Sequence, residues 1–261
     1  MSERPFSQEG SPIVVAHRGA SADEAENTLE AFERAIAVGA DAIEFDVRLT
    51  ADGVAVVLHD ADVDRTTDGH GPVGELTLAE VKRLRIRTAS GGLAEVPTLD
   101  EALRCLSGRA AVDIEIKHLP AAQGSAPDGE PEVDATLRAL EAVGFVGPVL
   151  VSSFTPSSLA HARARAPEIP TGLLTGFDVD AREALAAARG AGHPWVLPFA
   201  GRVAQAGPGF PGEVHDAGLR LGTWLVDDPA DAVALMRAGV DAVATNDPAT
   251  IVAARREAFG S

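Results

Sequence analysis

Eight short apolar runs, each followed by an amphipathic, alanine-rich stretch, constrain the fold of this chain more than any other feature. They predict strands at 13–17, 41–47, 110–117, 148–152, 171–174, 195–198, 219–224 and 240–245. They predict helices at 28–38, 98–106, 131–143, 155–165, 180–191, 211–217, 229–237 and 247–258. Alternating strands and helices are typical of a parallel sheet. Eight units within 261 residues favour an α/β TIM (β/α)8 barrel over an open doubly wound sheet. An open sheet would usually carry G-x-G-x-x-G after its first strand, and this chain has no such motif there.

One segment interrupts the repeat between the second and third units. After a short strand at 54–59, residues 60–97 precede the next helix and contain a short helix near 78–85. We therefore expect a single domain over 1–261 with an insertion at 60–97. A long excursion of this kind is either a functional element at the barrel mouth or a solvated decoration.

Composition limits the partners of the chain. Its net charge of -17, from 22 basic and 39 acidic residues, disfavours nucleic acid and anionic membranes. No apolar run reaches about 18 residues, which argues against membrane insertion. The N-terminal stretch lacks the apolar core of a signal peptide, and Cys105 is the single cysteine. We expect a cytoplasmic protein that needs a local positive charge, such as a bound cation, to hold an anionic substrate.

Acidic side chains share one face of the second and third strands. Strand alternation places Glu44 with Asp46, and Asp113 with Glu115 and Lys117, on the inward face of a barrel. Carboxylates from neighbouring strands form a hard oxygen site that suits Mg²⁺, Ca²⁺ or Mn²⁺. Lys117 could contact a phosphate oxygen, or it could pair with the same acids.

A hairpin follows the second strand. Asp52 and Gly53 form a favoured two-residue turn, which would pair positions whose numbers add to 105. Asp46 would then lie opposite His59, and the hairpin would bring an imidazole to the carboxylates. A histidine beside such a cluster is a candidate acid or base.

The first predicted strand ends in His17, Arg18 and Gly19. Arginine recognises phosphate through a planar fork of donors, and glycine allows a close backbone turn. Two histidines beside one metal suit phosphodiester cleavage, in which one accepts a proton from the attacking hydroxyl and the other protonates the leaving oxygen. The sequence does not assign these two roles. At the helix starts, Asn27 with Glu30 and Thr98 with Glu101 predict N-terminal caps.

Several motifs resemble those of the glycerophosphodiester phosphodiesterase family, and the resemblance covers nearly the whole chain. The stronger motifs are HRG at 17–19, ENT at 26–28, E-x-D at 44–46, T-x-D-G at 50–53, HD at 59–60, RTT-x-G at 65–69, P-T-L-x-E-A-L at 97–103 and E-x-K at 115–117. Weaker ones are SF at 153–154, W at 224 and T-N-D-P at 245–248.

This resemblance implies a TIM barrel with an insertion after the second strand. It implies a cytoplasmic, bacterial-type enzyme that hydrolyses glycerophosphodiesters to sn-glycerol 3-phosphate and an alcohol through a cyclic phosphate. Matched motif by motif, Glu44, Asp46 and Glu115 would bind one divalent metal ion. His17 and His59 would act as acid and base.

The resemblance also implies the residues that contact the substrate. Arg18 and Lys117 would contact the phosphate. Trp224 would form an apolar wall for the substrate, although simple packing within the barrel is an equal alternative for this residue.

Three other functions fit parts of the pattern. One is a phospholipase D-like hydrolase of lysolipid or sphingolipid head groups, against which the single cysteine and the missing signal sequence argue. Another is a metal-dependent sugar isomerase or aldolase, which would not need two histidines and Arg18. The third is a non-catalytic barrel, which would be expected to lack some of these residues. The head group, the native metal and the oligomeric state do not follow from the sequence.

Overall fold

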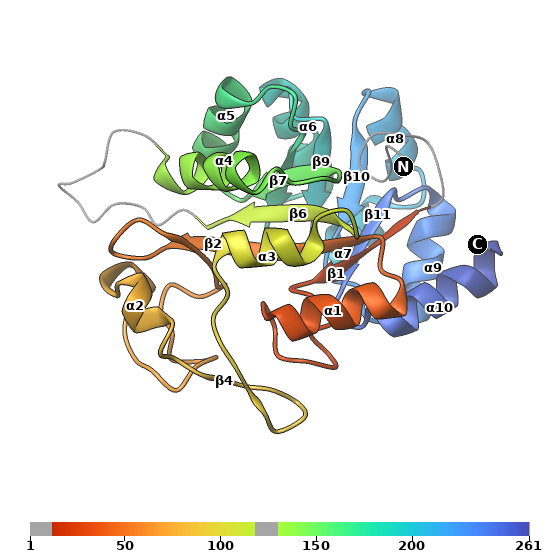
Figure 1. The fold of residues 1–261 in the computed structure, drawn as a ribbon. Helices are drawn as coiled ribbons and strands as arrows, with labels where there is room; N and C mark the ends of the chain where they lie inside the picture. Colours follow the sequence, from red (N-terminus) through yellow and green to blue (C-terminus); the bar gives the residue numbers. More distant parts are fainter. Residues whose placement is uncertain (1–11, 118–129, 261) are drawn as a thin grey trace.

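A closed barrel of eight parallel strands forms the centre of the computed structural model, which describes residues 12–117 and 130–260 (Figure 1). Residues 1–11, in which the sequence shows no apolar core of a signal peptide, lie outside the described residues. Neighbouring strands follow the order β1-β11-β10-β9-β8-β7-β6-β2, and pairing of β1 with β2 closes the barrel. The strands are β1 (Ile13–His17), β2 (Ala42–Leu49), β6 (Ala111–Ile116), β7 (Val149–Ser153), β8 (Thr171–Thr175), β9 (Trp195–Pro198), β10 (Arg220–Thr223) and β11 (Ala242–Thr245). The predicted TIM barrel is confirmed.

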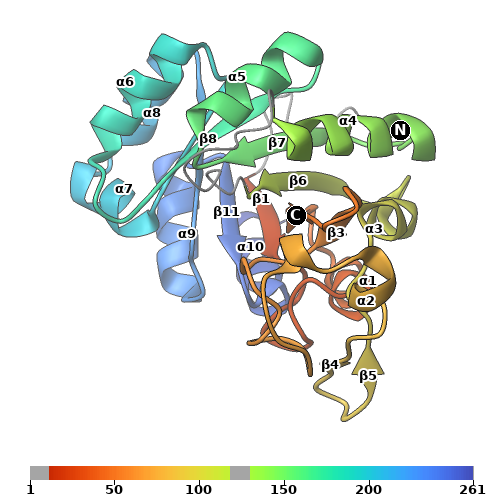
Figure 2. The same cartoon turned by 90° about the vertical axis from the view of Figure 1, so that its left-hand side faces the viewer.

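Helices surround the barrel and cover the outer faces of its strands (Figures 1 and 2). They are α1 (Leu29–Val38), α3 (Leu99–Leu106), α4 (Pro131–Val143), α5 (Pro156–Arg165), α6 (Ala181–Ala191), α7 (Ala200–Ala206), α8 (Phe210–Asp216), α9 (Pro229–Ala238) and α10 (Pro248–Phe259). The main core lies between these two layers, where the rings of Phe32 and Phe45 pack with their centroids 5.5 Å apart. Fully burying such a side chain stabilises the fold by roughly 1.5–3 kcal/mol. Among the helices of the described residues, none combines the length and the hydropathy needed to span a bilayer.

Local sequence signals explain where the helices begin and end. The carboxylates of Asp180 and Asp228 accept backbone N–H bonds at the starts of α6 and α9. These helices end at Gly192 and Gly239, whose φ angles of 75° and 103° are easily adopted by glycine alone. Thr98 caps α3 in a capping box with Glu101, as predicted.

The predicted cap of α1 at Asn27 is wrong. Thr28 is the N-cap, and its hydroxyl accepts a bond from the backbone N–H of Ala31. Asn27 instead has a φ of 58° and donates its side-chain N–H to Asp46 at 2.8 Å. This side chain therefore supports the carboxylate cluster rather than the helix.

The predicted register of the β2–β3 hairpin is also wrong. Val47 pairs with Val57 of β3 (Ala55–Val57), one position away from the expected pairing. The N–H of Thr50 bonds to the carbonyl of Val54 and closes a three-residue loop, in which Gly53 has a φ of 76°. Three-residue loops commonly place glycine in the left-handed region. Asp52 and Gly53 are therefore compatible with this three-residue loop as well as with the predicted two-residue turn.

The insertion after the second strand is confirmed and carries its own small core. It contains η1 (Val73–Glu75), α2 (Leu78–Val81), β4 (Ile86–Arg87) and β5 (Leu93–Ala94), so its predicted helix is shorter than expected. Figures 1 and 2 show that it extends from the barrel beside α1 and α3. Its buried side chains include Val63, Val73, Val81 and Val96, which pack beneath β3.

Candidate active site

The predicted reactive side chains meet at the carboxyl-terminal ends of β1, β2 and β6. Strand register places His17 beside Glu44, and Asp46 beside Glu115. A cavity of about 190 Å³ opens at this end of the barrel. Its lining includes His17, Arg18, Glu44, His59, Glu115, Lys117 and Trp224. Active sites of TIM barrels form at this end of the strands, because the loops that follow the strands surround it.

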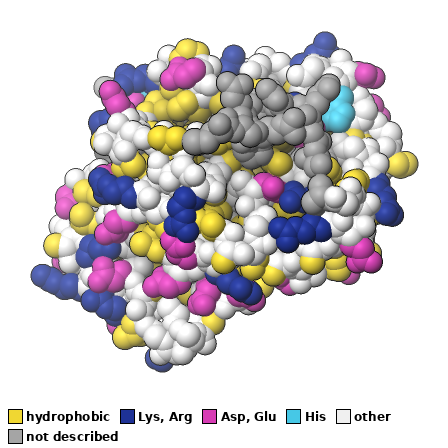
Figure 3. All heavy atoms as spheres, turned by 45° about the vertical axis from the view of Figure 1, so that its right-hand side comes forward, with side chains coloured by type: hydrophobic (Ala, Val, Ile, Leu, Met, Phe, Trp, Pro, Cys, Tyr) yellow, Lys and Arg dark blue, Asp and Glu magenta, His cyan; other side chains and the backbone are white. Residues whose placement is uncertain are grey.

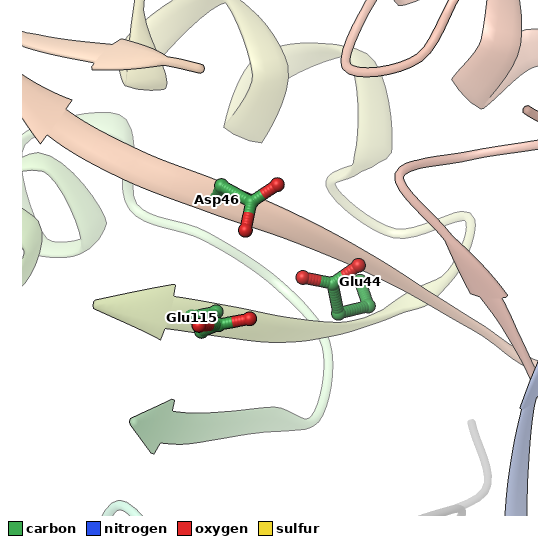
Figure 4. A group of neighbouring side chains, drawn as sticks. All are labelled: Glu44, Asp46 and Glu115. Carbon is green, nitrogen blue, oxygen red and sulfur yellow. The ribbon is translucent and has the colours of Figure 1, made fainter. Parts of the chain in front are cut away.

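Three buried carboxylates lie together beneath the mouth of the barrel. Glu44, Asp46 and Glu115 each offer an oxygen, and the three oxygens lie within 4.8 Å of one another (Figure 4). The Oε2 atom of Glu44 accepts the backbone N–H of Arg18 at 2.9 Å. Its buried Oε1 atom receives no hydrogen bond from the described residues. An all-oxygen set with such an unpartnered acceptor fits a hard divalent cation.

Burial and mutual repulsion act on these carboxylates. Burial, followed by the charge of Asp46, raises the pKa of Glu44 well above its usual range and that of Glu115 to about 7. Burial also opposes ionisation of Asp46, but the charges of Lys117 and Arg18 outweigh it and lower its pKa. Ionising all three carboxylates at once is therefore unfavourable in free energy unless positive charge is added beside them.

His17 is held with one ring nitrogen toward the carboxylates. Its Nδ1 lies 2.8 Å from Oδ1 of Asn246, and its Nε2 lies 3.9 Å from Glu44. The amide of Asn246 donates to the carboxylate of Asp227 at 2.9 Å. Because the Asp227 carboxylate accepts this hydrogen bond, the NH₂ group of Asn246 points to Asp227 and its amide oxygen faces His17. The amide oxygen is an acceptor, so Nδ1 of His17 carries the proton. Burial, followed by the charge of Arg18, lowers the pKa of His17.

His59 reaches the same cavity although the hairpin register differs from the prediction. Strand β3 ends at Val57, so His59 lies beyond it, where strand alternation no longer fixes the direction of a side chain. The guanidinium of Arg48 donates to the carbonyl of His59 at 2.8 Å, and Nδ1 of His59 lies 2.7 Å from Oδ1 of Asp60. Burial lowers the pKa of His59 more than the nearby Asp46 raises it.

Arg18 lies in a strained turn that directs it to the carboxylates. Its φ is 57°, and Gly19 follows with a φ of 84°. A Cβ atom on Gly19 would lie 2.7 Å from Ala31, so glycine is required for the close approach of this turn to α1. The guanidinium donates to Glu26 at 2.9 Å and lies 3.2 Å from Asp46.

Lys117 and Trp224 also line the cavity. The ammonium of Lys117 lies 3.1 Å from Asp46, contacts Glu115 and sits 5.7 Å from the ring centroid of Phe154. The ring of Trp224 packs edge-on against Phe154 with centroids 5.5 Å apart, and its indole N–H bonds to a backbone carbonyl at 3.0 Å. Trp224 thus both packs within the barrel and lines the cavity.

Several residues that hold the reactive groups were missed by sequence reasoning. They are Glu26, Asn27, Asp60, Asp227 and Asn246, which bond to Arg18, Asp46, His59 and His17 directly or through one partner. Four of them fall inside the recognised motifs ENT, HD and T-N-D-P. Because they lie on loops, strand alternation gives no sign of their direction.

On one face of the molecule, charged side chains are arranged differently from those in the cavity. On the face drawn in Figure 3, acidic and basic side chains are interspersed rather than gathered by sign. Within the site, by contrast, Arg18 and Lys117 lie directly against the carboxylates. Arg18 and Lys117 therefore supply, at the cavity itself, the positive groups that an anionic ligand would need.

Comparisons with known proteins agree with this site. Residues 17–250 match the model of the glycerophosphoryl diester phosphodiesterase family. A glycerophosphodiester phosphodiesterase of Caldanaerobacter subterraneus is 35% identical over 247 residues, covering 92% of this chain and 96% of the relative.

Solved structures give the same result. A phosphodiesterase of Oleispira antarctica, in complex with the product sn-glycerol-3-phosphate, is 28% identical with a TM-score of 0.81, covering 94% of this chain and 96% of that one. A glycerophosphodiester phosphodiesterase of Agrobacterium tumefaciens is 29% identical with a TM-score of 0.78, covering 93% and 99%.

Proposed function

Because the chain belongs to the glycerophosphoryl diester phosphodiesterase family, we propose that it hydrolyses glycerophosphodiesters to sn-glycerol 3-phosphate and an alcohol in the cavity at its barrel mouth. The observation that carries the proposal is that His17 and His59 line one cavity together with Glu44 and Glu115, which belong to the cluster of three buried carboxylates. The product bound to the relative from Oleispira antarctica supports sn-glycerol 3-phosphate as the product here.

Glu44, Asp46 and Glu115 would hold one divalent metal ion, Mg²⁺ or Ca²⁺, with Mn²⁺ as an alternative. The unpartnered Oε1 atom of Glu44 and the raised pKa values of Glu44 and Glu115 support this assignment. When bound, such an ion would supply positive charge to the phosphoryl oxygens as a Lewis acid.

The two histidines would move the protons of the reaction. In one, the neutral ring accepts the proton of the attacking hydroxyl at Nε2 as the new P–O bond forms. In the other, the protonated ring donates to the leaving oxygen as the old P–O bond breaks. Reversing these roles with water in the second step returns both rings to their starting states.

The remaining predicted residues would bind the substrate. Arg18 and Lys117 would face the phosphate, where an arginine fork and an ammonium neutralise anionic oxygens. Trp224, with Phe154 beside it, would form an apolar wall against the carbon atoms of the substrate. The cytoplasmic location, the single domain over 1–261 and the absence of nucleic-acid partners remain predictions.

Release of sn-glycerol 3-phosphate tests this function. The protein is first treated with chelator and then supplied with Mg²⁺, Ca²⁺ or Mn²⁺. Substrates are glycerophosphodiesters with choline, ethanolamine, inositol or glycerol head groups, and one lysophospholipid as a comparison. We expect metal-dependent release from at least one glycerophosphodiester. The lysophospholipid is assayed for its free head-group alcohol and lysophosphatidic acid, because head-group hydrolysis leaves its acyl chain in place. Hydrolysis of the lysophospholipid alone would replace this proposal with the phospholipase D-like function, and folded protein that hydrolyses none of the substrates would refute it.

A further inference from the structure

Arg65, near the start of the insertion, joins two carboxylates that come from different parts of the chain. Its Nη1 and Nη2 atoms donate to Glu26 at 2.8 and 2.7 Å, and its Nε donates to Asp60 at 2.5 Å. Glu26 lies in the loop after β1, whereas Asp60 follows the β2–β3 hairpin. A guanidinium fork fixes both distance and direction, so Arg65 sets these two loops relative to each other.

Each carboxylate bonded to Arg65 also holds a predicted reactive side chain. The second oxygen of Asp60 lies 2.7 Å from Nδ1 of His59. Glu26 accepts a bond from Nη1 of Arg18 at 2.9 Å. Two short paths therefore lead from the insertion to the cavity, one ending at an imidazole and the other at a guanidinium.

The carboxylates in these paths stay ionised. Burial opposes ionisation of Asp60, but hydrogen bonds from Arg65 and His59 outweigh it and hold its pKa at about 2. The pKa of Glu26 is lowered in the same way, as the bonds from Arg65 and Arg18 outweigh burial. An ionised Asp60 only accepts, so Nδ1 of His59 carries the proton and Nε2 keeps a lone pair.

We propose that Arg65 is a positioning residue, through which the insertion at 60–97 fixes His59 in the Nδ1–H tautomer and Arg18 in its direction. This inference rests on the proposed function and gives the insertion a part in it. Arg65 itself does not line the cavity, so it acts through Asp60 and Glu26. Displacing a reacting group by about 1 Å can lower a rate about a hundredfold.

A variant pair separates this role from general stability. About half of the Arg65 side chain is exposed, at 49%, and exposed ion pairs contribute little to stability. Arg182 provides a matched control, because it is 51% exposed and donates to both oxygens of Glu213 at 2.8 and 2.6 Å. We expect Arg65→Met to lower kcat/KM at least about tenfold, which is one log unit less than the loss of about a hundredfold for a displacement of about 1 Å. Arg182→Met should stay within about twofold of wild type.

Two further substitutions separate the two paths. Asp60→Asn should mainly lower kcat, because it acts on His59, whereas Glu26→Gln should mainly raise KM, because it acts on Arg18. If Arg65 acts through these residues, adding Arg65→Met to the double variant should have little further effect on kcat/KM. A full additional loss in that background would contradict the proposed paths.

A spectroscopic measurement tests the inference without any substrate. Nitrogen NMR distinguishes the two neutral tautomers of histidine, and the His59 signal is identified by its loss in His59→Gln. We expect the Nδ1–H form in wild type and in Arg182→Met, and a mixture of both forms in Arg65→Met. An unchanged His59 tautomer in Arg65→Met, or equal kinetic effects of the two arginine variants, would overturn the positioning role. Failure of wild type to release sn-glycerol 3-phosphate would count against the proposed function, and the NMR result would still decide on Arg65.

Discussion

Glu115→Gln should stabilise the metal-free protein at pH 8 and weaken its response to metal. Burial, followed by the charge of Asp46, raises the pKa of Glu115 from 4.5 to about 7, even with Lys117 in contact. Each pKa unit corresponds to about 1.4 kcal/mol, so the ionised carboxylate destabilises the folded chain by about 3 kcal/mol above pH 7. Glutamine has nearly the same shape and does not carry this charge.

The sign of the pH dependence follows from proton binding. Between pH 4.5 and 7 the folded state holds the Glu115 proton more tightly than the unfolded state does. Stability of the metal-free wild type therefore falls as the pH rises through this window, and the contribution from Glu115 is below about 1 kcal/mol at pH 5. The advantage of Glu115→Gln should thus be large at pH 8 and small at pH 5.

Bound metal should narrow the difference in stability between the two proteins, because it should stabilise wild type more than Glu115→Gln. A ligand present at about a hundredfold above its Kd stabilises the folded state by about 2.7 kcal/mol. Glu115→Gln replaces a charged ligand atom by a neutral one, so this gain should be smaller in the variant. Glu213, which lies outside the carboxylate cluster, provides the control, because Glu213→Gln should respond to metal as wild type does.

Thermal unfolding in chelator and in saturating Mg²⁺, Ca²⁺ or Mn²⁺ measures these differences. At pH 8 in chelator, Glu115→Gln should melt about 6–12 °C above wild type, from roughly 2–4 °C per kcal/mol for chains near this size. The reasoning is refuted if the variant melts below wild type under these conditions. Equal metal-induced shifts in both proteins would refute the ligand assignment.

Four further substitutions have expected outcomes. His17→Ala and His59→Ala should each lower turnover more than about a hundredfold with unchanged melting curves, and near-normal turnover in both would contradict two-histidine catalysis. Gly19→Ala should destabilise the fold by about 3 kcal/mol in urea titrations, because its Cβ would lie 2.7 Å from Ala31 at a positive φ; an unchanged midpoint would exclude that strain. Trp224→Ala should raise KM by a factor about tenfold larger than the factor by which it lowers kcat. A variant that is less stable than wild type but has an unchanged KM would show that Trp224 serves packing alone.

Strand alternation predicted the parts of the site that lie on regular strands. Glu44 and Asp46 on β2, and Glu115 on β6, share the inward face because successive side chains of a strand point to opposite sides. The outward residues of β2, such as Phe45, pack against α1 as the same rule requires. This part of the geometry follows from local periodicity alone.

Loop geometry could not be predicted in the same way. The hairpin register depended on a turn whose residues, including Asp52 and Gly53, satisfy loops of two or three residues equally well. The spacing of Asn27 and Glu30 predicted a helix cap. The actual bond from Asn27 to Asp46 could not be predicted, because only the folded barrel brings these two positions together. The bonds of Arg65 and Asn246 likewise join distant loops, and no spacing rule encodes them.

The location of the metal and phosphate tests the central claim most directly. Crystals soaked with Mn²⁺ and sn-glycerol 3-phosphate would be measured by anomalous diffraction. We expect one manganese peak bounded by Glu44, Asp46 and Glu115, with the phosphate of the product between that peak and the rings of His17 and His59. A peak elsewhere, or a product bound away from both histidines, would contradict the account.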